Sequence, residues 1–512
     1  MLTRRHLTIA VTAVLTVTTI APGQRKPAPR VLDKSFDAAV DSILAQWKVP
    51  GIGLAIVKGN QVIYLKGYGY KDLDKKVPVT HQTKFAIGSV SKSFTVTALA
   101  AQAQDKKFEW DAPLRRYLPD FQMFDPVATE RMTPRDLVTH RSGLPRHDVI
   151  WAATALTRDE IYQRIRYFEP SKDFRSVWQY QNLMFMTAGI LSSRLDGKPW
   201  EDVVKARVFG PLGMNTADFS VNDLQHSADY SFGYARLPTD SVVRIPYHVI
   251  DPIGPAGSIN ASVEEMAKYL TMHLNQGKFD GREVIPAAQA KEMQTQQMVM
   301  PSPAMSAGGT DLADQQYGMA FMIGAFRGHK MVHHGGNIDG FSAEVNFLPN
   351  DSLGVVVLTN MNGTFVRDFL PFVIYDRLLG LDPINWSSRY QTLFNRGRAM
   401  QDSARAKDVA AKVANTTPSH PLADYAGVYH HPGYGDITVA TTDGKLSFKY
   451  GIVEMGLAHW HYDVFETEPR SVAQPIRWKV QFHMDPTGAI SSLSLPIEPA
   501  LKPTVFARQK TQ

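Results

Sequence analysis

A serine and a lysine three residues apart stand at the start of an apolar, helix-forming stretch of the chain. Ser89 and Lys92 belong to the segment FAIGSVSKSFTVTALA, residues 85–100. Side chains at positions i and i+3 of a helix lie on one side, about one turn apart. A serine hydroxyl becomes a useful nucleophile only when a neighbour accepts its proton, and a lysine can do so only when its pKa is lowered. The pair is either a nucleophile with its base, or a helix cap beside a solvated lysine.

Two later segments decide between these interpretations. WQYQNLMF holds Tyr180 and Asn182, and MVHHGGN holds His333 and Gly335. In this order the segments resemble the three motifs of the serine β-lactamase and penicillin-binding-protein superfamily. The chain is most similar to its class C β-lactamase-like branch, which includes D-peptidases (peptidase S12 type) and esterases. The resemblance runs over residues 35–385 and includes the blocks TPRDLVTHRSGLP, GPAGSINASVEEMAKYL and LGVVVLTN.

The resemblance implies a role for each residue of the first two motifs. Ser89 would be the acylated nucleophile, and Lys92 would take its proton. Tyr180 would bridge the serine, the lysine and the third motif, and would help to activate the water that releases the acyl group. Asn182 would bind an amide or carbonyl group of the substrate.

The third motif departs from the pattern of the penicillin-recognising members, which usually have Lys-Thr-Gly or Lys-Ser-Gly there. In this sequence it reads His333-His334-Gly335. His333 would occupy the position of the lysine, and Gly335 would let the substrate lie along the strand edge. The backbone N–H groups of Ser89 and Gly336 would form the oxyanion hole. Histidine is mostly neutral at pH 7, so we expect poor β-lactamase activity, and esters, amides or peptide ends as substrates.

The elements that must position these residues indicate an α+β fold. Strands are predicted over residues 51–70, around a Gly-Asn turn, and in several runs after residue 317. An antiparallel sheet flanked by helices, with an inserted all-α region, would form a catalytic domain over residues 31–385. A helical linker is predicted over 386–419. A small all-β domain, a barrel or sandwich that resembles the lipocalin-like domain of some relatives, would follow over 420–512.

The first 30 residues predict an export signal and a polar spacer. They carry five of the 55 basic residues and no acidic one, which leaves 50 basic against 49 acidic residues in the remainder. This balance argues against a nucleic-acid partner. We expect a periplasmic or extracellular protein without a stable membrane span after signal removal, with an uncleaved signal anchor as the alternative. The substrate would be a small molecule or a peptide, and the sequence leaves monomer and homo-oligomer open.

Other chemistries are less well supported by the sequence. It contains no cysteine, no H-E-x-x-H motif and no G-x-S-x-G motif, so neither a metal nor a cofactor is expected. The pairs His430-His431 and His459-x-His461 predict polar strand faces rather than a zinc site. His140 is expected to have a positioning role. A genuine β-lactamase or D,D-carboxypeptidase, and a non-catalytic binding module, stay open as alternatives.

Overall fold

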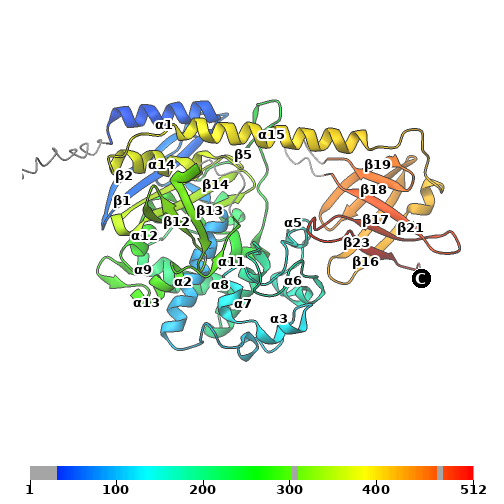
Figure 1. Cartoon of the computed structure of the whole chain (residues 1–512), viewed down its shortest axis with the longest axis horizontal. Coiled ribbons are helices and arrows are strands. Elements are labelled where there is room, and N and C mark those ends of the chain that lie inside the picture. The colour runs from blue at the N-terminus through cyan, green and yellow to red at the C-terminus, as the bar shows by residue number, and fades with distance from the viewer. Residues whose placement is uncertain (1–31, 302–308, 470–476, 511–512) are drawn as a thin grey trace, which may run out of the picture.

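The structure is a computed structural model that describes residues 32–301, 309–469 and 477–510. The predicted export signal over residues 1–30 lies outside these described residues. A larger part, built on a sheet with helices on both faces, is joined by one long helix to a smaller barrel (Figure 1). The predicted α+β class with an all-β C-terminal domain is therefore confirmed.

Within the described residues the larger part contains a nine-stranded antiparallel sheet. In sheet order its strands are β10 (Met298–Val299), β11 (Leu312–Tyr317), β12 (Met322–Phe326), β13 (His329–Ile338), β14 (Phe341–Leu348), β15 (Leu353–Thr359), β1 (Gly51–Lys58), β2 (Gln61–Asp72) and β3 (Val77–Pro78). Strand β1 pairs with β15, for example through Ile52 and Thr359. The sheet is therefore assembled from both ends of the domain, as the sequence predicts.

Both faces of this sheet are covered by helices. On one face lie α1 (Lys34–Trp47) and α14 (Val366–Leu378), and on the other lie α2 (Ser91–Gln104) and α12 (Val263–Leu274). Strands β14 and β15 are buried along their whole length. This explains why β15, LGVVVLT, is almost continuously apolar, whereas β14, FSAEVNFL, alternates apolar residues with the buried polar residues Ser342, Glu344 and Asn346.

The region between β4 and α12 is mainly helical. Its helices are α3 (Pro126–Arg131), α4 (Pro134–Leu137), α5 (Val149–Ala152), α6 (Arg158–Arg164), α7 (Asn182–Asp196), α8 (Trp200–Val204), α9 (Gly210–Leu212), α10 (Val221–Gln225) and α11 (Gly254–Gly257). Short strand pairs flank them: β4 (Lys84–Ala86) with β7 (Asn260–Ser262), β5 (Tyr234–Arg236) with β6 (Val242–Arg244), and β8 (Lys278–Phe279) with β9 (Arg282–Glu283).

Local sequence signals account for the helix ends near the site. Gln181 caps α7 by accepting a hydrogen bond from the Leu183 amide, and the helix ends at Gly197, which has a left-handed backbone. Ser262 and Glu265 form a capping box at the start of α12. The stretch 289–316 contains the end of α13 (Ala287–Met293), β10 and most of β11, while residues 302–308 lie outside the described residues.

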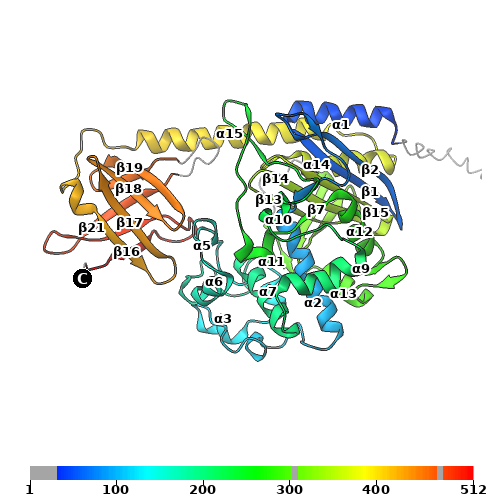
Figure 2. The same ribbon diagram turned by 180° about the vertical axis from the view of Figure 1, so that it is seen from behind.

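Helix α15 (Trp386–Ala410) links the sheet domain to the barrel (Figure 2). The barrel closes through β16 (Gly427–His431), β17 (Gly435–Thr442), β18 (Lys445–Tyr450), β19 (Val453–His461), β20 (Val464–Thr467), β21 (Lys479–Met484), β22 (Ile490–Leu495) and β23 (Thr504–Arg508). Of the two all-β folds considered from the sequence, it is the barrel. None of the helices in the described part of the chain is long and apolar enough to cross a membrane.

Candidate active site

Ser89 lies in a 3-10 turn, Gly88–Val90, that leads directly into α2. Its side chain is partly exposed, whereas its neighbours on both sides are buried. Gly88 has a left-handed backbone, with φ of 51°, and a Cβ atom on it would stand 2.8 Å from the backbone nitrogen of Asn337. A glycine is therefore required here, because it lets β13 approach the serine.

Lys92 lies one turn further along and is completely buried. Its Nζ is 3.0 Å from Ser89 Oγ, 2.8 Å from Asn182 Oδ1 and 2.7 Å from the carbonyl oxygen of Ala256. Burial, reinforced by the nearby Arg146, lowers the pKa of Lys92 well below its usual range. A neutral amine has two N–H groups and one lone pair.

The partners of Lys92 fix how its neutral amine is oriented. The carbonyl oxygen of Ala256 can only accept a hydrogen bond. The same holds for Asn182 Oδ1, because Asn182 Nδ2 donates to Asp148 Oδ1 over 2.9 Å and so defines the orientation of the amide. Both N–H groups of the amine are then used, and its lone pair is directed at the Ser89 hydroxyl. The arrangement is that of a base ready to accept the serine proton.

Tyr180, which precedes α7, is the third member of this cluster. It is hydrogen-bonded to Ser89, and Lys92 Nζ lies 4.8 Å from the centre of its ring. Burial raises the pKa of Tyr180 to about 12, although the bond to Ser89 and the nearby Arg146 oppose this effect. The guanidinium of Arg146 lies 5.0 Å from the centre of the same ring. At neutral pH the phenol keeps its proton and can pass it to a neighbour.

His140 supports Tyr180 from behind. The two ring centres are 4.2 Å apart, and the ring of Tyr317 lies 4.6 Å from that of His140. The backbone N–H of Gln181 donates to His140 Nδ1 over 3.0 Å. Burial, followed by the charge of Lys92, lowers the pKa of His140 well below its usual range. These contacts agree with the positioning role expected for this histidine.

The two adjacent histidines of β13 point to opposite faces of the sheet. His333 Nδ1 lies 2.9 Å from Glu344 Oε1, on the face covered by α14. His334 is buried on the opposite face, where its Nδ1 donates to the Gly335 carbonyl over 2.7 Å and its Nε2 accepts from Tyr317 Oη over 3.1 Å. Burial, with Lys92 nearby, lowers the pKa of His334 to about 3.

The structure therefore does not bring the His333 side chain together with Ser89 and Lys92. Side chains alternate between the faces of a strand, so His334 takes the position at the site that the sequence assigned to His333. The glycines follow the same alternation. A Cβ on Gly335 would stand 2.9 Å from Glu344 Oε2, whereas one on Gly336 would stand 1.9 Å from the carbonyl oxygen of Ile87 and 3.0 Å from the Ser89 nitrogen.

The edge of β13 that faces the nucleophile is open. Pairing with β12 ends at His333, whereas pairing with β14 continues to Ile338. Two-residue turns join β12 to β13 and β13 to β14, and the residues that flank such a turn hydrogen-bond to each other. Both turns then direct the N–H groups of Gly335 and Asn337 to the open edge, and that of Gly336 into the ladder with β14.

The oxyanion donor predicted at Gly336 is thus displaced by one residue. Arg367 Nη1 donates to the carbonyl oxygens of both Gly336 and Ala343, its partner on β14, which agrees with this orientation. The Asn337 nitrogen is the one that lies against Gly88. The backbone nitrogens of Ser89 and Asn337 therefore both lie at the contact between the Gly88–Val90 turn and β13.

Asn182 also differs from its expected role. Its side chain is buried and engaged by Lys92 and Asp148, so it holds the base instead of offering a free amide to a substrate. Arg146 and Asp148, which act on Lys92 from one loop, were missed from the sequence because no motif marks them. Among the described residues, no group of three or more His, Asp or Glu side chains is arranged to hold a metal ion.

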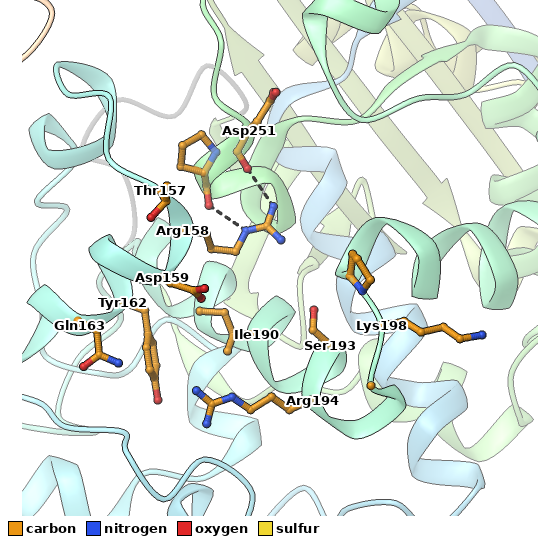
Figure 3. Close-up of a pocket in the computed structure, with 13 residues that line it drawn as sticks. Thr157, Arg158, Asp159, Tyr162, Gln163, Ile190, Ser193, Arg194, Lys198 and Asp251 are labelled. Carbon is orange, nitrogen blue, oxygen red and sulfur yellow. Dashed lines mark hydrogen bonds between the residues drawn. The ribbon is translucent and has the colours of Figure 1, made fainter.

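A large surface cavity lies elsewhere. It measures about 930 Å³ and is bounded by α6, α7 and the segment around Asp251. Figure 3 shows Arg158 across its floor, donating to the carbonyl oxygens of Asp251 and Pro252. Its lining contains none of the residues around Ser89, so this cavity is separate from the catalytic cluster.

The comparisons with known proteins agree with this geometry. The model of the beta-lactamase family matches residues 36–375, and a second model, a domain of unknown function (DUF3471), matches residues 411–509. An unguisins hydrolase of Aspergillus campestris is 28% identical over 430 residues, which cover 80% of this chain and 78% of that protein. A D-aminopeptidase of Cereibacter sphaeroides is 29% identical over 341 residues, which cover 64% and 60%.

A solved structure extends the likeness into the barrel. The octameric penicillin-binding protein homologue from Pyrococcus abyssi matches with a TM-score of 0.59 and 21% sequence identity, covering 92% of this chain and 99% of that chain. At this identity the likeness concerns the fold. The family match spans well over half of the sequence and contains Ser89, Lys92, Tyr180 and the open edge of β13. The chain belongs to the beta-lactamase family.

Proposed function

We propose that the protein is a serine hydrolase that cleaves amide or ester bonds through a covalent acyl-enzyme on Ser89. The observation that carries this proposal is the set of hydrogen bonds around Lys92 Nζ, in which two carbonyl oxygens take its two N–H groups. The lone pair of a buried, neutral amine is then left for the hydroxyl of Ser89 at 3.0 Å. A helix cap beside a solvated lysine would show neither burial nor this orientation.

Acylation follows from these positions. Ser89 Oγ attacks the carbonyl carbon of the substrate, and its proton passes to Lys92 Nζ. The negative charge on the former carbonyl oxygen is stabilised by the N–H groups of Ser89 and Asn337, whose dipoles are fixed before the reaction. The adduct collapses when the leaving amine or alcohol receives a proton from Lys92, relayed by the phenol of Tyr180.

Deacylation uses the same groups in reverse. Water attacks the ester on Ser89 and gives a proton to the Tyr180–Lys92 pair. Ser89 Oγ leaves as the acid product forms, and it regains its proton from Lys92. The cycle consumes one water molecule for each bond cleaved and needs no other reactant.

We assign the enzyme to the class C β-lactamase-like, peptidase S12-type branch, with amides or peptide ends as its preferred substrates. Both curated relatives named above have hydrolase or peptidase activities in their names. The neutral His334 provides no cation for the carboxylate of a β-lactam. A genuine β-lactamase, a D,D-carboxypeptidase and an esterase use the same machinery, and pocket shape decides among them.

The test is a panel of D- and L-amino acid p-nitroanilides, p-nitrophenyl esters and nitrocefin. Wild type should turn over at least one anilide or ester, and Ser89→Ala should lose about 10⁴-fold or more of that rate. Ser93→Ala is the matched control, because this buried serine on the same helix bonds to the Val90 carbonyl and to Tyr269 instead of to the catalytic cluster. A folded wild type that neither hydrolyses the panel nor forms an adduct with a fluorescent phosphonate or penicillin would favour a non-catalytic binding module.

Two further properties are proposed from the sequence and the relatives. Residues 1–30 support export to the periplasm or the exterior, and N-terminal sequencing of the mature protein would reveal whether they are removed. Assembly of this chain into a homo-oligomer is supported by the octameric homologue from Pyrococcus abyssi. Light scattering of the purified protein would measure the assembly directly.

A further inference from the structure

The loop between α4 and α5 contacts the catalytic cluster through two charged residues. Arg146 lies over the ring of Tyr180, and Asp148 accepts the hydrogen bond that orients Asn182. The residue between them, His147, is 1% exposed and has a left-handed backbone, with φ of 49°. A non-glycine residue adopts this conformation only where its surroundings compensate for the strain.

The surroundings of His147 come in large part from the C-terminal barrel. Its backbone N–H donates to Glu498 Oε2 over 2.9 Å. Its ring Nε2 donates to the carbonyl oxygen of Glu169 over 3.1 Å, so its Nδ1 must accept from Tyr434 Oη, which lies 2.6 Å away. Burial lowers the pKa of His147 to about 4, which keeps this neutral tautomer in place at working pH.

The barrel also holds the chain on the far side of α5. The N–H of Ile452 donates to the carbonyl oxygen of Ala153 over 2.8 Å. A Cβ on Gly451, in the turn between β18 and β19, would stand 2.2 Å from the same oxygen. The barrel therefore contacts both ends of the segment from His147 to Ala153, and Asp148 lies between these contacts.

We infer that the barrel positions the catalytic base: Tyr434 and Glu498 fix the conformation of His147 and thereby hold Arg146 against Tyr180 and Asp148 against Asn182. This inference rests on the proposed function, since it states how that function is set up. It assigns Tyr434 and Glu498 as positioning residues, because neither lies at the nucleophile. The chain is then one catalytic unit rather than a hydrolase with an independent appendage.

The experiment compares Tyr434→Phe, Glu498→Ala and Glu498→Gln in the full-length chain. The first two remove one hydrogen bond each to His147, and Gln keeps an oxygen that can accept from its N–H. Tyr429→Phe is the matched control, because this buried barrel tyrosine donates to the Tyr425 carbonyl inside the barrel. The measurements are kcat, KM and the pH dependence of kcat/KM on the best substrate of the panel.

Tyr434→Phe and Glu498→Ala should lower kcat by about 10- to 100-fold, since small displacements of a catalytic group have effects of this size. KM should change less, and Glu498→Gln should recover most of the loss. The acidic limb of the pH profile should move to higher pH, because both burial and Arg146 lower the pKa of Lys92. The other charged or titratable groups near Lys92, namely His140, His334 and Tyr180, are held by contacts outside the barrel.

Normal kcat and an unshifted pH profile in these variants, with a loss of thermal stability like that of Tyr429→Phe, would overturn the inference. Amide hydrogen exchange over residues 144–153 gives a readout that needs no substrate. Exchange should rise in Glu498→Ala and not in Tyr429→Phe, and equal exchange would also overturn the inference. A wild type without turnover but with this exchange pattern would refute the proposed function and leave the mechanical link between barrel and loop in place.

Discussion

Lys92 is placed where an ammonium group would lose its hydration without gaining a carboxylate partner in direct contact. The nearest acid, Asp148, is separated from it by the amide of Asn182. Burial therefore dominates, and the pKa of Lys92 falls well below its usual range. A group in this state is useful as a base, because a lowered pKa increases the fraction of neutral amine at a given pH.

The first prediction concerns the pH dependence of catalysis. The neutral fraction of Lys92 increases with pH, so kcat/KM should rise as pH passes upward through its lowered pKa. Lys92→Arg, which keeps a permanent charge, should lose about 10²–10⁴-fold in kcat. A pH–rate profile that is flat from about 5 to 9 would argue against Lys92 as the base.

Gly336 is predicted to be essential for a steric reason. A methyl group there would collide with the carbonyl oxygen of Ile87, which is backbone and cannot rotate away. Gly336→Ala should lower kcat by about 100-fold and also lower the melting temperature. Gly397→Ala is the control, because that glycine lies within α15 with open space around it, and alanine there should stabilise by about 0.5–1 kcal/mol. Equal behaviour of the two variants would contradict the packing described for β13.

A lysine at the third motif should change substrate preference only at the correct position. His334→Lys would introduce a cation beside the nucleophile, and we expect penicillin turnover to rise by about tenfold or more. His333→Lys would place its cation beside Glu344 on the other face, with no gain. An equal gain in both variants, or comparable kcat/KM of wild type on a penicillin and a p-nitrophenyl ester, would refute the assignment.

The one-residue displacement in β13 shows what the sequence could and could not provide. The pairing of Ser89 with Lys92, which the structure places 3.0 Å apart, could be predicted because a helical spacing of three residues is short and local. The assignment of His333 and Gly336 failed because a family pattern was matched without fixing the alternation of the strand. The turn at Asp339-Gly340 was visible in the sequence, and counting back by twos from Ile338 groups Gly336 and His334 on one face of the strand, apart from His333.

At the scale of elements, the sequence predicted the sheet strands and α15 well. The apolar runs of the strands, and the Gly-Asn and Asp-Gly turns between them, are local signals. The hydrogen bonds between the barrel and His147 could not be predicted, because they join residues more than 280 positions apart and depend on how two folded parts meet. The same holds for Asp148, whose partner Asn182 lies on a different element.

Helix α15 is attached to the barrel by a charged cluster around Glu466. Arg405 Nη1 and Lys479 Nζ lie 2.6 and 2.5 Å from Glu466 Oε1, and Lys479 Nζ also lies 3.2 Å from the centre of the Trp460 ring. Although burial opposes it, these partners lower the pKa of Glu466 to about 2. The cluster thereby fixes the last turns of the helix on the barrel.

Glu466→Ala should lower the free energy of unfolding by about 1–2 kcal/mol. Since the carboxyl pKa is lower in the folded state, this contribution is full above pH 4.5 and is lost as pH falls toward 2. Thermal melts at pH 7 and pH 3 would measure both effects, with Asp402→Ala on the exposed side of α15 as control. Equal melting temperatures of Glu466→Ala and wild type at pH 7 would show that the cluster does not stabilise the attachment of α15 to the barrel.

At the scale of the whole molecule, the barrel is joined to the hydrolase domain by α15 at one side and by its contacts with residues 147–153 and 164–168 at the other. Inserting one alanine after Asp402 would turn the barrel by about 100° and move it by about 1.5 Å relative to the sheet. We expect loss of kcat and of melting temperature. The same insertion in the loop after Thr417 should be tolerated, since a loop can absorb it. Unchanged kinetics in the helix variant would contradict a rigid linkage.

The length of α15 therefore sets the rotation of the barrel about the helix axis as well as its distance from the sheet. In a helix that is fixed at both ends, each added residue rotates the far end by about 100° but moves it along the helix axis by only about 1.5 Å. Relatives built on this plan could vary their loops freely, yet they could lengthen this helix only in steps close to whole turns, about 3.6 residues. Each step would also require a new fit where Tyr434 and Glu498 meet His147.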